Sequence, residues 1–289
     1  MEGEQAIHAF LAYLHTLERS LKTVIGYQSD VKRFRAFYEH KHQAAWYVED
    51  TTHEDILAFL HTLKTEEGLQ PATRNRILFG LRTFFDFCKR QHWIEYSPME
   101  DIPPVTTPKV ERKVIPLPAL EIYLQQVDHP IVAAAAWTML YSGLRISECM
   151  ALTFHDVEWE PEARIIVRHG KGNKSRIVPI SHKLREILQT YETHHRPRVN
   201  VEERYFATER TGQLSPSQFT RVLHQIAEQR HWPMPITAHM LRHAFATELV
   251  RKGVNLVQIQ KLLGHSSLSV TSVYTHAQMT ELQDAVDRL

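Results

Sequence analysis

The sequence has little of several features that mark particular classes of protein. Its 289 residues contain two cysteines, Cys88 and Cys149, and both lie in apolar stretches with helical periodicity. They are therefore expected to be buried thiols in a reducing compartment and not a disulfide framework. The chain also lacks an apolar run long enough to cross a bilayer, and its first residues do not form a signal peptide. These absences favour a cytoplasmic protein without a membrane partner.

Motifs for a metal or a nucleotide are missing as well. Asn173 stands where a P-loop would need its second glycine, and no helix is expected after Ser175. His239 and His243 have the spacing of a zinc-binding helix, but the glutamate of H-E-x-x-H is absent. No third ligand is evident among the 19 histidines. We therefore predict no metal site and no cofactor.

A strong excess of one charge is also absent, because 34 Lys and Arg oppose 33 Asp and Glu for a net charge of +1. This average conceals two basic stretches, residues 19–41 and 71–93, inside an otherwise acidic first half. Each stretch carries several more basic than acidic residues on an expected helix. Such clustering predicts a positive face directed at nucleic acid. A solvated charged face would give the same pattern, so charge alone does not decide.

A proline-rich stretch divides the sequence, whose length suits two domains. Residues 101–118 contain five prolines, which favours an extended linker over helix or strand. Before it, four apolar stripes with helical spacing predict four helices. After it, the pattern is mixed and mostly helical. We therefore predict a mainly α chain, with a helical domain over residues 1–101, a linker over 102–117 and a mixed α/β domain over 118–289.

Local signals place some of these elements more closely. Thr51 and Glu54 have the spacing of a capping box and are expected to open the third helix. In the second domain, residues 164–168 and 176–180 alternate like strands and are expected to form a hairpin. Residues 205–207 are expected to add a short strand. The second domain should therefore hold a small antiparallel sheet among its helices.

Residues suited to phosphate binding gather at four places in the second domain. At the first, Arg145 opens a predicted short helix, where free N–H groups and the helix dipole attract an anion. A surface ion pair between Arg145 and Glu148 is the alternative. At the second, Lys171 stands in the turn of the predicted hairpin, with Lys174 and Arg176 behind it. A basic hairpin tip of this kind suits contact with a nucleic-acid backbone or groove.

The other two places add histidine and tyrosine. His239 and Arg242 share one face of a predicted helix because residues three apart do so. Near the C-terminus Gly264 ends another predicted helix, His265 follows it, and Tyr274 comes nine residues later. Alone, Tyr274 fits an ordinary half-buried tyrosine. Together the four places supply the groups that stabilise a pentavalent phosphorane without a metal while a phenolate attacks in line.

In order and approximate spacing, these motifs resemble those of the tyrosine recombinases, the phage integrase family. The motifs that carry the resemblance are Gly-Leu-Arg145-Ile-Ser-Glu, Gly-Lys171-Gly, His239-x-x-Arg242-His, Leu-Gly-His265 and Tyr274. They span the whole second domain, while the helical first half resembles the family's four-helix core-binding domain. The chain is similar to the compact Xer-type or transposon-resolving members. The resemblance implies the tyrosine recombinase fold, with a catalytic domain after the linker.

The resemblance also implies a role for each matching residue. Tyr274 would attack the scissile phosphate to give a 3′-phosphotyrosyl link, and strand exchange would pass through a Holliday junction without ATP or metal. Arg145 and Arg242 would clamp the phosphate, and Glu148 would support Arg145. Lys171 would be the general acid that protonates the leaving oxygen.

Double-stranded DNA with an inverted-repeat core site is the partner that the resemblance implies. His239 would assist proton transfer from the tyrosine, and His265 would hydrogen-bond the phosphate. Base reading is expected at the start of the helix after Pro216. The residues that we expect to contact DNA are Lys22, Lys32, Arg33, Arg74, Arg76, Arg82, Lys174, Arg176, Ser217 and Gln218.

The implied assembly is a homotetramer, a pair of dimers on DNA within the nucleoid. Its C-terminal helix, with apolar positions Met279, Leu282, Val286 and Leu289, would dock into a neighbouring protomer, or alternatively pack on its own subunit. The reaction could resolve dimers or transposon cointegrates or integrate a mobile element, with or without an accessory protein or partner recombinase. A type IB topoisomerase and a catalytically silent DNA-binding regulator are the competing hypotheses.

Overall fold

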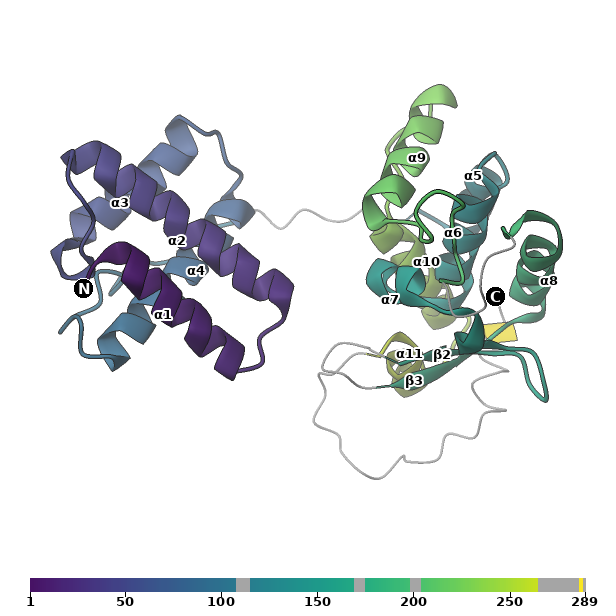
Figure 1. Ribbon diagram of the computed structural model, residues 1–289. Helices are drawn as coiled ribbons and strands as arrows, with labels where there is room; N and C mark the ends of the chain where they lie inside the picture. The colour runs from purple at the N-terminus through teal and green to yellow at the C-terminus, as the bar shows by residue number, and fades with distance from the viewer. Residues whose placement is uncertain (108–114, 169–174, 198–203, 265–285, 288–289) are drawn as a thin grey trace. The chain divides into compact units, whose positions relative to one another are not determined.

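The computed structural model describes residues 1–107, 115–168, 175–197, 204–264 and 286–287 (Figure 1). The chain divides into two compact units, Met1–Glu111 and Arg112–Leu289, and the division falls within the stretch expected to be a linker. The described residues are mostly helical and include one small antiparallel sheet. This confirms the predicted fold class.

The first unit is built from helices whose apolar faces share a core rich in aromatic rings. Phe34 packs edge-on against Trp46, Phe59 and Phe85, with ring centroids 5.5, 5.3 and 6.0 Å apart. Edge-to-face pairs of this kind stabilise a core beyond the burial of their area. The helices are α1 Gly3–Thr16, α2 Leu21–His42, α3 His53–Thr65 and α4 Pro71–Arg90, with a 3₁₀ turn Val48–Asp50 before α3 (Figure 1).

The capping box of α3 lies one residue later than the sequence predicts. Thr52 is the N-cap, because its hydroxyl accepts the Asp55 N–H at 3.2 Å and the Asp55 carboxylate accepts the Thr52 N–H at 3.1 Å. Thr51 and Glu54 have the same spacing, so the pattern alone does not choose between the two pairs. The structure chooses because Trp46 Nε1 donates to the Thr51 hydroxyl at 2.8 Å.

The second unit is organised around α6, Pro130–Ser142. This helix is buried almost all round because α7, α8 and α10 pack on it, which is why its sequence lacks a polar face. The helices around it are α5 Leu117–Leu124, α7 Ile146–Ala151, α8 His182–Thr190, α9 Pro216–Gln229, α10 Ala238–Arg251 and α11 Leu256–Leu263. Shorter turns are the 3₁₀ turn Phe154–Asp156 and a π-helical turn Tyr191–His195 that continues α8.

The sheet of the second unit has three antiparallel strands in the order β1-β2-β3. They are β1 Val157–Glu158, β2 Arg164–Val167 and β3 Arg176–Pro179, with Ile165 opposite Val178. The predicted hairpin is therefore confirmed, and β1 is an addition too short to have a sequence signal.

The prediction of a strand at residues 205–207 is wrong. Arg204 forms an isolated bridge with Thr153, and the chain then turns. Tyr205 and Phe206 are nevertheless fully buried, and the Tyr205 N–H donates to the Leu152 carbonyl at 2.7 Å. These two residues fill the core next to α7. Their apolar character therefore reflects burial and not strand pairing.

Two smaller expectations concern buried residues. Cys88 and Cys149 are both buried free thiols, as predicted, and burial raises the pKa of Cys88 to about 12.

At the C-terminus Val286 is fully buried against its own chain, and Asp287 Oδ1 accepts the His182 N–H at 3.3 Å. The other apolar positions of the expected C-terminal helix, Met279, Leu282 and Leu289, lie outside the described residues.

Candidate active site

Glu148 lies at the centre of a buried cluster of arginines in the second unit. Arg145 Nη1 donates to its Oε1 at 2.7 Å, and the Arg145 backbone N–H donates to its Oε2 at 2.8 Å. Arg176 binds both oxygens, from Nη1 at 3.0 Å and from Nη2 at 2.7 Å. Arg242 Nη1 lies 3.9 Å from Oε2. A single carboxylate, 3% exposed, therefore sits among three guanidinium groups from the start of α7, from β3 and from α10.

Backbone carbonyls at the ends of two helices hold other edges of these arginines. Arg242 donates from Nη1 to the carbonyl of Gly143, where α6 ends, and from Nη2 to the carbonyl of Leu263 at 2.8 Å. Arg145 Nη2 donates to the carbonyl of Gly264, where α11 ends, at 3.2 Å. Carbonyls at a helix C-terminus lack partners within the helix and carry partial negative charge. The two helix ends therefore fix the arginines and stabilise their charge.

Glycine is required at both helix ends. Gly143 has φ +64°, and a Cβ there would lie 2.5 Å from a ring carbon of Phe245 and 2.8 Å from a methyl of Leu263. Gly264 has φ +63°, and its Cβ would lie 2.8 Å from Nη1 of Arg176. Both positions combine a left-handed backbone with a close approach, which only glycine accepts without strain. The glycines of the Gly-Leu-Arg and Leu-Gly-His motifs thus let carbonyls reach the arginines.

The electrostatics of the cluster favour an anion. Burial alone would raise the pKa of Glu148, but hydrogen bonds from Arg176 and Arg145 outweigh it and lower the pKa to about 2. Burial and the neighbouring charge of Arg145 lower the pKa of Arg242 to about 10, which leaves it protonated at neutral pH. Three guanidinium groups and one carboxylate give these four side chains a net charge of +2. That charge matches the dianionic phosphorane formed when a nucleophile attacks a phosphodiester.

Arg176 is the member of this cluster that sequence reasoning places elsewhere. The sequence assigns it to a DNA contact beside the hairpin turn, whereas its side chain is 10% exposed and faces Glu148. Its Nε also donates to the carbonyl of Leu262 at 2.8 Å. Strand alternation is the signal that could have found this, because Arg176 shares a face of β3 with Val178, which is fully buried. An inward-facing arginine needs an acidic partner, and Glu148 supplies it.

His239 lies in the first turn of α10, one turn before Arg242. Its side chain is exposed, and its ring is parallel to that of His243 at a centroid distance of 6.3 Å. Within the described ranges no group of three histidine, cysteine, aspartate or glutamate side chains is placed to hold a metal. Four other predicted site residues, Lys171, Lys174, His265 and Tyr274, lie outside the described residues. His265 directly follows Gly264 in the sequence, and Arg145 binds the Gly264 carbonyl.

The basic residues predicted to contact DNA from the first unit differ in how they are held. Lys22 and Lys32 on α2 are exposed, and neither has an ion-pair partner among the residues that the structure describes. Arg33, also exposed, lies 3.6 Å from a carboxylate oxygen of Glu67. Arg74 is half-buried, and its Nε has no hydrogen-bond partner in the described part of the chain. Lys22 and Lys32 can therefore turn toward a phosphate at little cost, whereas Arg33 would exchange its contact with Glu67.

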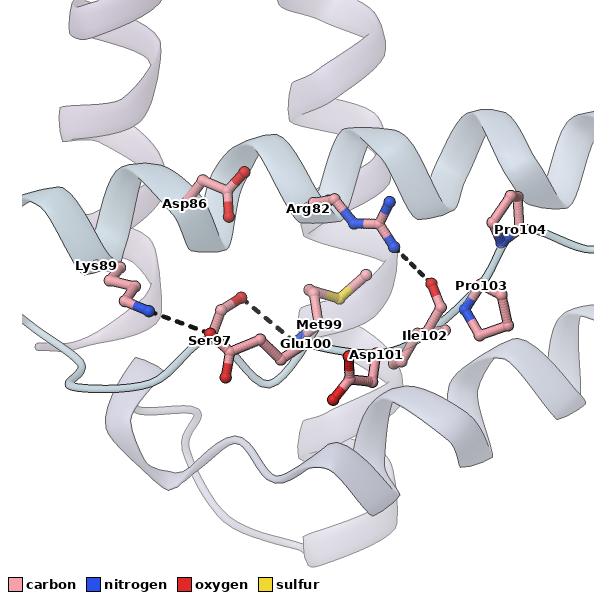
Figure 2. A pocket seen from close by; sticks show the side chains of 10 residues that line it. All are labelled: Arg82, Asp86, Lys89, Ser97, Met99, Glu100, Asp101, Ile102, Pro103 and Pro104. Atoms are coloured by element: carbon pink, nitrogen blue, oxygen red, sulfur yellow. Dashed lines mark hydrogen bonds and ion pairs between the residues drawn. The ribbon is translucent and has the colours of Figure 1, made fainter.

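Arg76 and Arg82 on α4 are instead engaged within the unit. Arg76 donates from Nη1 and Nη2 to the two oxygens of the buried Asp30, each at 2.7 Å. Arg82 Nη2 donates to the carbonyl of Ile102, as the dashed line in Figure 2 marks, and its guanidinium lies 5.7 Å from the ring centre of Phe79. Both arginines thus join elements of the unit, and DNA contact would require them to keep or exchange these bonds.

Figure 2 shows the pocket that Arg82 borders, between α4 and the segment that leads into the linker. The pocket measures about 450 Å³. Arg82 and Lys89 line it together with three acids, and Lys89 pairs with one of them, Glu100, at 3.1 Å. An excess of carboxylates repels phosphate. We therefore assign the pocket no role in DNA binding.

The predicted base-reading residues Ser217 and Gln218 lie in the first turn of α9. Ser215 caps this helix by accepting the Gln218 N–H at 3.1 Å. Ser217 and Gln218 line a pocket of about 410 Å³ together with Arg210 and Arg221. A helix start flanked by two arginines suits the approach of a nucleic-acid backbone.

Across the described part of the chain, no helix has the length and apolar character needed to span a membrane.

Comparisons with known proteins identify the family of the chain. Residues 123–281 match the phage integrase family, and residues 7–92 match the phage integrase N-terminal SAM-like domain. A tyrosine recombinase XerC from Halalkalibacterium halodurans is 31% identical over 301 residues, which cover 98% of this chain and 96% of the relative.

Two solved structures show the same fold at low sequence identity. A lambda integrase fragment, crystallised as a dimer bound to a COC′ core site, is similar with a TM-score of 0.76 and 18% identity, over 96% of this chain and 100% of the other. A lambda integrase tetramer bound to a Holliday junction is similar with a TM-score of 0.75 and 18% identity, over 94% and 80% of the two chains. From the family match and the full-length relative, the chain belongs to the phage integrase family of tyrosine site-specific recombinases.

Proposed function

We propose that this recombinase cleaves and rejoins double-stranded DNA at an inverted-repeat site through a 3′-phosphotyrosyl intermediate and a Holliday junction. The observation that carries the proposal is the buried arginine cluster with its net charge of +2. It lies at the end of α11, directly before the chain segment that contains His265 and Tyr274. The DNA-bound lambda integrase structures with the same fold support DNA as the partner.

In the proposed reaction, Arg145 and Arg242 bind the non-bridging oxygens of the scissile phosphate. Their guanidinium groups are held in advance by Glu148 and by helix-end carbonyls, so little reorganisation is needed as charge develops. The Tyr274 oxygen attacks phosphorus and forms the new ester bond, and the bond from phosphorus to the 5′ oxygen breaks. Because one phosphoester replaces another, the energy of the bond is kept for rejoining.

Proton transfers in this scheme fall to three residues matched by motif. Lys171 protonates the leaving 5′ oxygen, and His239 assists removal of the phenolic proton of Tyr274. His265 hydrogen-bonds a phosphate oxygen. The exposed position of His239 one turn from Arg242 supports its access to a substrate.

A trapped covalent adduct tests the proposal. The probe is a pool of nicked duplexes with randomised inverted-repeat arms of about ten base pairs each, in which cleavage next to the nick releases a short strand and prevents rejoining. The wild-type chain should form an adduct that survives denaturing electrophoresis, and Tyr274→Phe should form none. An adduct with Tyr274→Phe would show that another residue is the nucleophile. Relaxation of a plasmid that lacks any selected site would point instead to a type IB topoisomerase.

For the assembly we propose a homotetramer in which C-terminal helices are exchanged between protomers. The burial of Val286 and the hydrogen bond from the His182 N–H to Asp287 show where the C-terminal tail binds on the catalytic unit, here called its seat. We infer that a neighbour's tail replaces the chain's own tail in this seat on DNA. A chain that ends before Met279 should still bind the selected DNA but should synapse and recombine less. Unchanged recombination would contradict exchange.

The biological reaction that we propose is resolution of dimers or transposon cointegrates, or integration of a mobile element. Sequencing the DNA captured in adducts, and finding whether paired sites lie in a chromosome or at the ends of an element, would distinguish the three. A reaction that needs added host extract would identify an accessory protein or a partner recombinase.

A further inference from the structure

Arg176 binds both oxygens of Glu148 and also donates from its third nitrogen, Nε, to a backbone carbonyl. Its Nη1 and Nη2 bind the two oxygens of Glu148, and its Nε binds the carbonyl of Leu262. Because all three of its side-chain nitrogens already donate within the protein, few of its N–H groups are left for a substrate. A bidentate arginine held at a third point is a rigid connection and not an adaptable surface contact.

The hydrogen bonds of Arg176 complete a ring of contacts that includes Arg145. Arg145 binds Glu148, Glu148 binds Arg176, and Arg176 binds the carbonyl of Leu262. Two residues later in the chain, the carbonyl of Gly264 binds Arg145 again. Three elements distant in sequence, namely α7, β3 and the end of α11, are thereby fixed to one another at the same place.

The ring also sets the charge that the site presents. Without Arg176, Glu148 would offset one of the two remaining arginines, and the three side chains would carry a net charge of +1. With Arg176, Glu148 has its own counter-ion and can orient Arg145 while the cluster keeps +2. Because charges interact strongly in a site with little water, this difference acts most on the transition state, where the phosphate carries an extra negative charge.

We propose that Arg176 is a positioning residue for cleavage, which acts through Glu148 and the end of α11 to place Arg145 against the scissile phosphate. This inference rests on the proposed function, because it assumes that Arg145 binds that phosphate. On this proposal, Arg176 does not act as a DNA contact of the basic hairpin. It affects the rate of cleavage and not the affinity for DNA, although it lies outside the predicted catalytic residues.

The first variant is Arg176→Lys, which keeps the positive charge but cannot bind both Glu148 oxygens and the Leu262 carbonyl together. Its matched control is Arg164→Lys on the neighbouring strand β2, because Arg164 pairs with Glu158 outside the cluster. The substrate is the nicked duplex selected from the randomised pool. Arg176→Lys should cleave about a hundredfold more slowly, whereas its DNA affinity and the cleavage rate of Arg164→Lys should stay within about twofold of wild type.

A methylphosphonate substrate separates positioning from a general loss of structure. A methyl group in place of one non-bridging oxygen removes the charge that the arginines neutralise. The defect of Arg176→Lys should therefore shrink to less than about tenfold on this substrate. An equal defect on both substrates, or cleavage of the phosphate substrate at the wild-type rate, would overturn the proposal.

A charge-balanced pair keeps the test decisive if Arg176→Lys folds poorly. Replacing Glu148→Gln and Arg176→Gln together removes one positive and one negative charge, so the cluster keeps its net charge of +2. If Arg176 acts through Glu148, the double variant should cleave faster than the product of the two single effects predicts. Independent effects would contradict the proposal. Wild-type adduct formation is measured in parallel: its absence would overturn the proposed function together with this inference, whereas a normal rate in Arg176→Lys would overturn this inference alone.

Discussion

Glu148 holds Arg145 at two points, with Oε1 2.7 Å from Nη1 and Oε2 2.8 Å from the backbone nitrogen. The side-chain bond orients the guanidinium, and the backbone bond satisfies a free N–H at the start of α7. The same carboxylate thus fixes both the arginine and the helix that presents it. Loss of this carboxylate should therefore disturb both the arginine and the helix.

Glu148→Gln should impair stability and cleavage together. The amide group would turn N–H donors toward arginines that have only donors, and the net charge of the cluster would rise to +3. Removal of one partner from a buried ion pair costs about 3–5 kcal/mol, and misplacement of Arg145 should slow cleavage about a hundredfold. Urea unfolding and single-turnover cleavage measure the two effects.

The matched control for this change is Glu158→Gln. Glu158 pairs with Arg164 across β1 and β2, but its side chain is 35% exposed. Loss of such a surface pair should cost less than about 1 kcal/mol and leave cleavage intact. If Glu148→Gln behaved like this control, the carboxylate would not organise the site.

Acid should unfold the second unit through Glu148. Its folded pKa of about 2 lies below the ordinary value of 4.5, so the folded state binds the proton less tightly than the unfolded state. The carboxylate therefore contributes stability that is fully present above pH 4.5 and is lost as the pH falls toward 2. The free energy of unfolding of wild type should drop steeply across this window, and that of Glu148→Gln should drop less.

The first unit has a similar acid-sensitive group in Asp55. Burial by itself would raise the pKa of Asp55, but hydrogen bonds from Lys41, His42 and Thr52 lower it strongly. Asp55→Asn should therefore weaken the unit at pH 7 and flatten its stability profile below about pH 4, the ordinary aspartate pKa. The control Glu160→Gln removes a carboxylate that is 81% exposed and should leave the profile unchanged. Urea midpoints between pH 7 and pH 3 decide, and an unaltered slope in Asp55→Asn would contradict the assignment.

Gly264→Ala should reduce cleavage by more than its backbone strain alone would cause. A left-handed alanine costs about 1 kcal/mol, and the new Cβ would also lie 2.8 Å from Arg176 Nη1. Arg176 cannot move aside without leaving Glu148, so cleavage should fall about tenfold or more.

Gly253→Ala is the control for that change. Gly253 has φ +75° in the same unit, with open space where a Cβ would be, so its variant carries the backbone strain alone. Both variants should lose similar stability in thermal unfolding, and only Gly264→Ala should lose cleavage. Equal cleavage rates would mean that Arg176 yields to the methyl group at no functional cost.

The features that sequence predicts well are those set by neighbours along the chain. Apolar stripes place α1 to α4, and the alternation over residues 164–168 and 176–180 places the hairpin. The motifs bring Arg145 next to Glu148 and His239 near Arg242 because helical spacing fixes both pairs. The burial of a single side chain is predicted less well by its place in such a stripe. Leu17 and Leu21 continue the stripes of α1 and α2 but are 44% and 68% exposed.

The features that sequence misses depend on contacts across the fold. Arg242 meets the carbonyl of Gly143 from 99 residues away, and Arg145 meets Gly264 across 119 residues. No local pattern specifies which carbonyl an arginine will reach. The partners of Arg176 are missed for the same reason, since its position beside a basic turn suggests a DNA contact while its hydrogen bonds go to α7 and α11.

Exposed lysines and engaged arginines on the first unit should respond differently to substitution. Lys22→Ala with Lys32→Ala removes two exposed cations, and if both contact phosphates, the salt slope of DNA binding should fall by about 1.8, or 0.9 per contact. Arg76→Ala instead strands Asp30, which Arg76 binds with two bonds of 2.7 Å, and should cost about 1–3 kcal/mol of stability. Lys64→Ala, an exposed lysine on α3, is the control for the lysine pair. Affinity for the selected duplex is measured at several salt concentrations, with urea unfolding alongside. A double lysine variant whose slope matches Lys64→Ala would remove α2 from the DNA-binding face.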